Sequence, residues 1–233
     1  MSKPGISAPR RMFLRTALAS APAALAAAGA ADVLVPAQAA ENPPPYTPKF
    51  FQEPHWSTLQ RLVDVLIPPG DEGPGGLEAG VAEFIDQQMD TPYGQGKLWY
   101  MDGPHDPKAP GNMGYQLPYA PRDLYPKALA AFEAAVRQAH GKPFAELDAD
   151  AREGAVSDLE QGKLALTDDI PAAAFFALLL QNVHEGYFCD PVHGGNKGMA
   201  AWKMVGFPGA RGDYYDWVDQ YSKKYPLGPV SIR

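Results

Sequence analysis

The sequence has one cysteine in 233 residues and lacks the motifs of cofactor-binding folds. One thiol cannot form an internal disulfide, which excludes a disulfide-stabilised fold. No Cys-x-x-Cys-His for haem, cysteine cluster for zinc, Gly-x-Gly-x-x-Gly for a dinucleotide or Gly-x-Ser-x-Gly of a hydrolase is present. We therefore expect no cofactor, no metal site and no catalytic residue on this chain.

Positive charge and strand patterns are also scarce. The net charge is −7, and the chain after residue 39 has 16 basic against 26 acidic residues, or −10. An acidic chain without a basic stripe argues against binding to nucleic acid. Alternating apolar patterns are missing, so we expect an all-α fold. Its 25 prolines and 23 glycines, about a fifth of the chain, predict long irregular loops.

The N-terminus has no apolar run suited to a stable membrane span. Residues 17–35 are rich in alanine and are interrupted by Pro22 and Asp32. The alternatives are a membrane anchor or an ordinary N-terminal helix, but a twin-arginine export signal fits better. Its residues are Arg10, Arg11, Phe13 and Leu14. The small residues at 37–39 predict cleavage after Ala39.

The remaining chain divides into an extended lead-in and one helical domain. We expect a signal peptide over 1–39, a proline-rich lead-in over 40–54 and a single irregular helical domain over 55–233. Apolar spacing predicts helices over 56–66, 77–90, 122–140, 148–162 and from 167–171 to Gly186, a possible turn over 198–205, and an amphipathic helix over 214–225. The aromatic-rich segment 91–121 has no period, and we expect it to be a packed loop.

The densest chemistry lies in residues 184–209, which we call the central block. Cys189 with His184 or His193 could form a catalytic pair, and with Asp190 a metal site, but the spacing supports neither. A buried thiol or a bond to another protein fits this cysteine better. The run Gly194-Gly195-Asn196-Lys197-Gly198 lacks the strand and the Lys-Ser/Thr pair of a phosphate loop, so it is interpreted as a tight turn.

Two blocks carry a resemblance to a known family. Glu185-Gly-Tyr-Phe-Cys-Asp-Pro-Val-His-Gly-Gly-Asn-Lys197, with Trp202-Lys203 and Gly206-Phe-Pro-Gly209, resembles the signature of the gluconate 2-dehydrogenase subunit 3 family. Residues 73–86 resemble that family's second block, and the resemblance covers about residues 50–213. One departure is His193, where the family more often has Tyr.

The resemblance implies a small, non-catalytic subunit that supports folding, export and stability of a catalytic flavoprotein. The partners it implies are an FAD-dependent dehydrogenase of the glucose–methanol–choline type, a multihaem cytochrome c subunit carrying haem c, and the twin-arginine translocase. The FAD would belong to the catalytic partner, which oxidises a sugar, sugar acid or polyol. The location would be the periplasm at the outer face of the inner membrane, with membrane contact only through the complex.

The predicted partner interface combines the central block with the 91–121 loop. Its residues are Glu185, Tyr187, Phe188, Cys189, Asp190, His193, Gly194, Gly195, Asn196, Lys197, Trp202 and Lys203. Tryptophan is enriched at interface hot spots, so we expect Trp202 to be an anchor. Cys189 is a candidate for an intersubunit disulfide. The alternatives to an accessory subunit are a free-standing periplasmic enzyme using Cys189 and His193, or an unrelated binding protein.

Overall fold

The structure is a computed structural model that describes residues 46–106 and 109–232. Within these residues the chain forms six α-helices and five short 3-10 helices and no β-strand, which confirms the all-α prediction. The α-helices are α2 (His55–Leu66), α3 (Val81–Gln88), α4 (Pro121–His140), α5 (Ala149–Glu160), α6 (Ala172–Phe188) and α7 (Ala200–Val205). The 3-10 helices are η1 (Gly111–Met113), η2 (Phe144–Glu146), η3 (Pro191–His193), η4 (Lys197–Met199) and η5 (Tyr215–Trp217).

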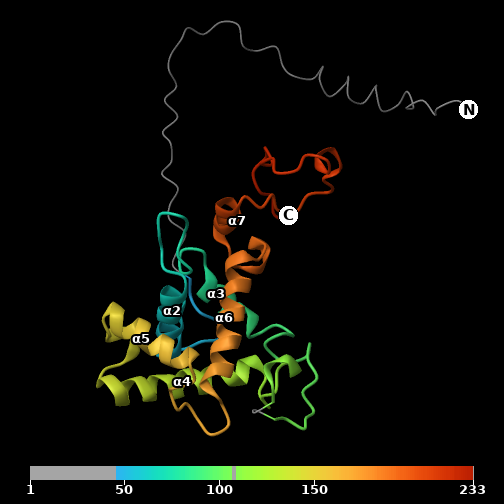
Figure 1. Cartoon of the computed structure of the whole chain (residues 1–233). Coiled ribbons are helices and arrows are strands. Elements are labelled where there is room, and N and C mark those ends of the chain that lie inside the picture. The colour runs from blue at the N-terminus through green and yellow to red at the C-terminus, as the bar shows by residue number, and fades with distance from the viewer. Residues whose placement is uncertain (1–45, 107–108, 233) are drawn as a thin grey trace, which may run out of the picture. The chain divides into compact units, whose positions relative to one another are not determined.

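Helix α6 is the centre of the core. It packs against α2, α3 and α5, while α2 in turn packs on α4 (Figure 1). Its first nine residues are all apolar, and its exposed residues are confined to one stripe that includes Ala173, Ala177 and Gln181. Phe175, Leu179 and Val183 of this helix are completely buried. The buried part of α6 therefore fixes the position of its C-terminal end, where the central block begins.

Several helix boundaries follow the signals read from the sequence. Helix α2 ends at Leu66, just before the two prolines at 68–69, and α4 ends at Gly141. Asp148 caps α5, because its Oδ1 accepts the backbone N–H of Ala151 at 2.9 Å. These ends were predictable because each depends on a local residue type.

Two boundaries differ from the prediction. Helix α3 begins at Val81, not at residue 77, because residues 77–80 fold into a turn in which the Gly80 N–H donates to the carbonyl of Leu77. Helix α6 continues through Gly186 to Phe188. Gly186 is needed for close packing: a Cβ there would lie 2.7 Å from Cδ1 of Phe84 on α3.

The predicted amphipathic helix over 214–225 is wrong. Only η5 forms there, and Ser222 has a φ of 60°. The apolar residues of this segment have no core surface to cover, and a helix of this length without a packing partner is marginal. Its rings pack on one another instead, with Tyr225 edge-on to Tyr214 and to Trp217.

The described part of the lead-in, residues 46–54, has no helix but is tied to α3 through the buried Asp86. This carboxylate accepts the backbone N–H groups of Lys49, Phe50 and Phe51, and the hydroxyl of Tyr46, at 2.7–3.0 Å. Burial and the neighbouring Asp86 raise the pKa of Tyr46. Residues 40–45 and the leader lie outside the described residues. No helix within 46–106 or 109–232 is long and apolar enough to cross a membrane.

Candidate functional site

The central block is organised around Asn196, which is completely buried. Its backbone N–H donates to the carbonyl of Gly186 at 3.0 Å, and its Nδ2 donates to the carbonyl of Cys189 at 2.9 Å. Its Oδ1 accepts the N–H of Ala201 at 3.0 Å. One side chain thus joins the end of α6 to the start of α7, which makes the block a shaped surface.

The two glycines before Asn196 allow a close approach of backbones. A Cβ at Gly195 would lie 2.1 Å from the carbonyl oxygen of Gly186 and 2.9 Å from Sγ of Cys189. Gly194 has a φ of 96°, and a Cβ there would meet the amide of Gln87 on α3. The predicted tight turn at 194–196 is therefore confirmed. Gln87, Gly186 and Cys189 occupy the space that side chains at the two glycines would need.

Lys197 contacts other residues of the chain through both its backbone N–H and its ammonium group. Its N–H donates to the carbonyl of Ala79 at 3.0 Å, and its Nζ forms an ion pair with Oε1 of Glu83 at 2.5 Å. The backbone N–H groups of Asn196 and Lys197 and the Lys197 ammonium group thus already have partners within the chain. The interpretation of this run as a turn is confirmed.

Cys189 is half-buried, and its thiol donates to the carbonyl of Gly186 at 3.5 Å. Burial raises the pKa of this thiol, and the opposing Gly195 N–H does not cancel that effect. The thiol lines an open cleft of about 430 Å³ whose other walls include Phe84, Phe188 and His193. The site therefore holds a protonated, weakly nucleophilic cysteine.

Asp190 ties the C-terminal residues to the central block. Its Oδ1 accepts the Ser231 hydroxyl at 2.5 Å and the Val192 N–H at 3.0 Å, and its Oδ2 accepts the Ile232 N–H at 2.9 Å. Burial acts to raise the pKa of Asp190, but these hydrogen bonds and the His193 charge outweigh it and hold the pKa below its ordinary value. The carboxylate is therefore charged at neutral pH.

The structure separates the predicted interface residues into internal and exposed sets. Tyr187, Asp190, Gly195, Asn196 and Trp202 are buried, Cys189 and Gly194 are intermediate, and Glu185, Phe188, His193, Lys197 and Lys203 are exposed. The export residues Arg10, Arg11, Phe13 and Leu14 lie outside the described residues.

Trp202 is 6% exposed and lies inside the block, contrary to the exposed position that an anchor would need. Its Nε1 donates to the carbonyl of Phe188 at 2.8 Å, and Phe207 packs edge-on against its ring. Tyr187 is also internal, because its hydroxyl donates to the carbonyl of Pro74 at 2.7 Å. A tryptophan whose N–H bonds to a backbone carbonyl can lie in the core of a domain or at an interface between proteins. The sequence alone does not distinguish these two positions.

Three aromatic residues of the 91–121 loop pack together, as predicted, whereas Leu98, Tyr100 and Met113 in the same loop are exposed. Trp99 lies between Tyr93 and Tyr115, with ring centroids 5.3 and 4.8 Å away. The hydroxyl of Tyr93 accepts Nδ2 of Asn182 on α6 at 2.6 Å, and Oδ1 of Asn182 accepts the Tyr125 hydroxyl at 2.8 Å. Sequence reasoning missed Asn182, although a lone amide within an apolar run was a usable signal.

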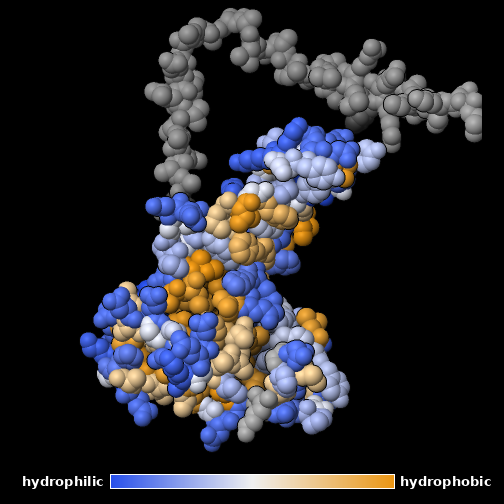
Figure 2. Space-filling view, viewed as in Figure 1, coloured by the Kyte–Doolittle hydropathy of each residue, from blue (hydrophilic) through white to orange (hydrophobic). Residues whose placement is uncertain are grey.

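Exposed hydrophobic side chains gather at the C-terminal end of the described chain. Twelve of the fifteen large ones lie between Phe188 and Ile232, and the other three are Leu98, Tyr100 and Met113. Figure 2 shows orange and tan atoms over the region of α7. The surface beyond it is blue and pale with little orange, because that segment carries charged residues and the hydropathy scale places Tyr and Trp near its middle. Exposed apolar groups concentrated in this way are typical of protein contact surfaces.

These observations define a helical domain whose glycine-rich turn is held internally and whose apolar side chains are exposed around it. The sequence profile of one family, gluconate 2-dehydrogenase subunit 3, matches residues 53–209. The chain therefore belongs to the gluconate 2-dehydrogenase subunit 3 family. No curated protein and no solved structure matched the chain.

Proposed function

We propose that this chain is a non-catalytic small subunit of an FAD-dependent dehydrogenase complex in the periplasm. The observation that carries the proposal is the family match over 53–209, which includes both sequence blocks. The hydrogen bonds of the central block support it, because the polar groups of Asn196, Lys197 and Trp202 bond to other residues of the same chain. The exposed apolar side chains beyond Phe188 are suited to contact with another protein and carry no catalytic group.

Its partners are the catalytic flavoprotein of the glucose–methanol–choline type and a multihaem cytochrome c. FAD belongs to the first and haem c to the second. The substrate, a sugar, sugar acid or polyol, is recognised in the flavoprotein and not in this chain. The small subunit supports folding, stability and export of the flavoprotein, and it reaches the membrane surface only through the complex.

A free-standing enzyme using Cys189 and His193 is the weaker candidate. A catalytic thiol needs a lowered pKa, usually from a nearby cation or a helix N-terminus. Burial raises the pKa of Cys189 instead, and the thiol hydrogen bonds to the carbonyl of Gly186 at 3.5 Å. The same raised pKa lowers the thiolate fraction that would react with a partner's cysteine. The proposed assembly therefore does not depend on a bond to Cys189, and non-reducing gels of the complex test whether one forms.

The test is to purify the tagged chain from its native host and identify what accompanies it. We expect a yellow complex containing a flavoprotein that oxidises a sugar or polyol with an artificial acceptor. The chain alone, after dissociation, should be colourless and inactive. A flavin or haem band retained by the isolated chain, activity abolished by Cys189→Ala, or a monomer with no partner would each contradict the proposal.

A further inference from the structure

The carboxylate of Asp86 on α3 holds the part of the lead-in that precedes the first described helix. Its Oδ2 accepts the Tyr46 hydroxyl and the Lys49 N–H, both at 2.7 Å, and its Oδ1 accepts the N–H groups of Phe50 at 3.0 Å and Phe51 at 2.8 Å. Asp86 is completely buried, and a buried carboxylate is tolerated only where hydrogen bonds replace its hydration. We call this arrangement of Asp86 and residues 46–51 the Asp86 clasp.

The aromatic side chains of the lead-in pack on the core beside this carboxylate. Phe51 is 3% exposed and lies edge-on to Tyr125 of α4, with ring centroids 5.8 Å apart. The ring of Tyr46 packs on Trp56 of α2 at 5.9 Å. Asp86 lies 35 residues from Phe51 along the chain, and Tyr125 lies farther still. The lead-in can therefore reach its observed place only after α3 and α4 have taken their folded positions.

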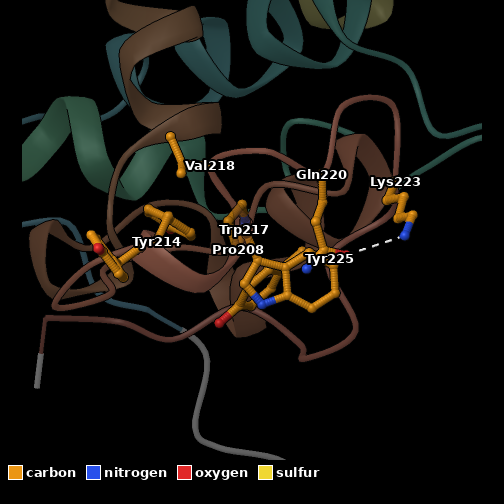
Figure 3. Close-up of a pocket in the computed structure, with 8 residues that line it drawn as sticks. Pro208, Tyr214, Trp217, Val218, Gln220, Lys223 and Tyr225 are labelled. Atoms are coloured by element: carbon orange, nitrogen blue, oxygen red, sulfur yellow. Dashed lines mark hydrogen bonds between the residues drawn. The ribbon is translucent and has the colours of Figure 1, made fainter.

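The C-terminal segment of the described chain packs in a different way. The ring of Tyr225 contacts those of Tyr214 and Trp217 beside an open cleft of about 580 Å³ (Figure 3). Within the described residues, Phe51 belongs to the hydrophobic core and Tyr46 packs against it, whereas these three rings do neither. The lead-in is therefore the terminal segment whose order depends directly on the packed core.

The clasp lies close in sequence to the predicted export leader. Six residues, 40–45, separate the predicted cleavage site after Ala39 from Tyr46. Residues 46–51 are therefore among the first parts of the mature chain behind a leader that the translocase has bound. Three of these six residues are aromatic, at positions 46, 50 and 51, and without the clasp they would expose an apolar segment at that place.

We infer that the Asp86 clasp makes export of this chain conditional on a packed domain. The inference rests on the proposed export of the chain and adds a folding check to it. In the folded chain the clasp keeps the aromatic side chains behind the leader packed. In a chain whose α3 and α4 are not in place, Asp86 and Tyr125 cannot receive the lead-in, and the same side chains are open to chaperones and to aggregation. A route for folded cargo disfavours such a segment directly behind its address.

The experiment compares two buried carboxylates in the full chain with its leader, produced without the flavoprotein. Asp86→Asn keeps one acceptor oxygen but places an NH₂ group against donors of the lead-in. The control is Glu133→Gln on α4. Glu133 is also buried, and it accepts the Thr58 hydroxyl at 2.6 Å and the Phe144 N–H at 3.3 Å, two donors outside the lead-in. Both variants remove one negative charge and keep the size of the side chain.

Chymotrypsin measures the clasp directly, because it cleaves after aromatic residues and three of these lie at 46, 50 and 51. Cleavage of the native chain follows the population in which the segment is open. We expect Asp86→Asn to raise the cleavage rate at these sites about tenfold or more and Glu133→Gln to stay within about twofold of wild type. Tyr46→Phe removes one of the four donors and leaves Asp86 in place, so it should give an intermediate rate. It tests the clasp should Asp86→Asn fail to fold.

Cell fractionation measures export as the ratio of periplasmic to cytoplasmic chain. We expect this ratio to fall about fivefold or more in Asp86→Asn and to stay within about twofold of wild type in Glu133→Gln, with Tyr46→Phe between them.

Each other outcome has a definite meaning. Unchanged chymotrypsin cleavage of Asp86→Asn, or faster cleavage with unchanged export, overturns the inference. An equal loss of export in both carboxylate variants also overturns it, because export would then follow overall stability and not the clasp. A wild-type chain that stays in the cytoplasm, or one exported normally with Arg10 and Arg11 replaced by Lys, overturns the proposed export itself.

Discussion

Asn196 illustrates how one side chain fixes the shape of the central block. It adopts a φ of 44° while its amide joins Cys189 to Ala201. Non-glycine residues avoid this left-handed conformation unless their side chain gains local hydrogen bonds, as an asparagine does here. The identity of the residue therefore follows from its hydrogen bonds and not from any contact with a ligand.

Replacing Asn196 should destabilise the isolated chain. Asn196→Ala leaves a buried carbonyl and a buried N–H without partners, at about 1–3 kcal/mol for each group, so we expect a loss of about 3 kcal/mol or more of unfolding free energy. Asn196→Gly loses the same bonds but relieves the positive φ, and its loss should be about 0.5–1 kcal/mol smaller. Denaturant unfolding of both variants measures this; equal stability of Asn196→Ala and wild type would contradict it.

The buried position of Trp202 changes the effect that we expect from its substitution. Because it is 6% exposed within the chain, Trp202→Ala should lower the unfolding free energy of the isolated subunit by about 3–5 kcal/mol, as for other buried aromatic truncations. Trp202→Phe should cost less, through the lost bond to Phe188. The comparison uses thermal or denaturant unfolding without the flavoprotein. A Trp202→Ala chain as stable as wild type would return this residue to the interface.

At the scale of elements, glycine is where the sequence was most ambiguous. Gly141 and Gly186 both follow apolar helical patterns, yet only the first ends a helix. The difference lies in tertiary contact: Phe84 occupies the space beside Gly186, and no sequence pattern announces a neighbour 102 residues away. Helix ends set by proline or a capping Asp148 were predictable because their cause is local.

This ambiguity makes a paired prediction. Gly→Ala in a helix usually stabilises by about 0.5–1 kcal/mol, and Gly154→Ala on the exposed face of α5, where no atom lies within 4 Å of the added Cβ, should do so. Gly186→Ala should instead destabilise by about 1–3 kcal/mol, because its Cβ overlaps the buried Phe84 ring. Unfolding curves of the two variants test the opposite signs. Stabilisation by both would refute the packing role of Gly186.

The Asp190 anchor makes a prediction about acid. Because the folded state lowers the pKa of Asp190, the anchor contributes fully above the ordinary Asp value of about 3.9 and is lost as pH falls through the lower folded value. The Ile232 amide signal should therefore titrate with a midpoint below that ordinary value, and this step should be missing in Asp190→Asn. A midpoint above it would show that burial, and not the hydrogen bonds from Ser231 and Ile232, controls this carboxylate.

At the scale of the molecule, composition and periodicity predicted an all-α domain and most of its helices, because these depend on averages over many residues. The central block was found for the same reason, through its density of glycine, proline and aromatic residues. Which aromatic residues face outward was not predictable from the sequence: Trp202 is 6% exposed and Phe207 is 47% exposed, although both lie in the same glycine-rich block. The helix expected over 214–225 failed because periodicity reports an apolar face but not whether a surface is there to meet it.

Export is the prediction that concerns the whole complex. A flavoprotein folds around its FAD in the cytoplasm and needs a route that accepts folded cargo, whereas this chain is proposed to carry no cofactor of its own. We expect the address at Arg10 and Arg11 to serve the partner, which crosses the membrane docked to the folded domain. Replacing both residues with Lys should leave both proteins in the cytoplasm, with the flavoprotein folded, loaded with FAD and still bound.

The converse variant separates the address from the predicted interface. A chain with an intact leader but with Phe188→Ser, His193→Ala and Lys203→Ala, which are exposed members of that interface, should fold and be exported without the flavoprotein. Cell fractionation with activity staining follows both proteins, and Asp216→Ala with Asp219→Ala and Lys224→Ala, three exposed residues outside the predicted interface, serves as the control. Normal arrival of the flavoprotein in the periplasm with the double-Lys leader would mean that it carries or borrows another address. The link between docking and export would then be wrong.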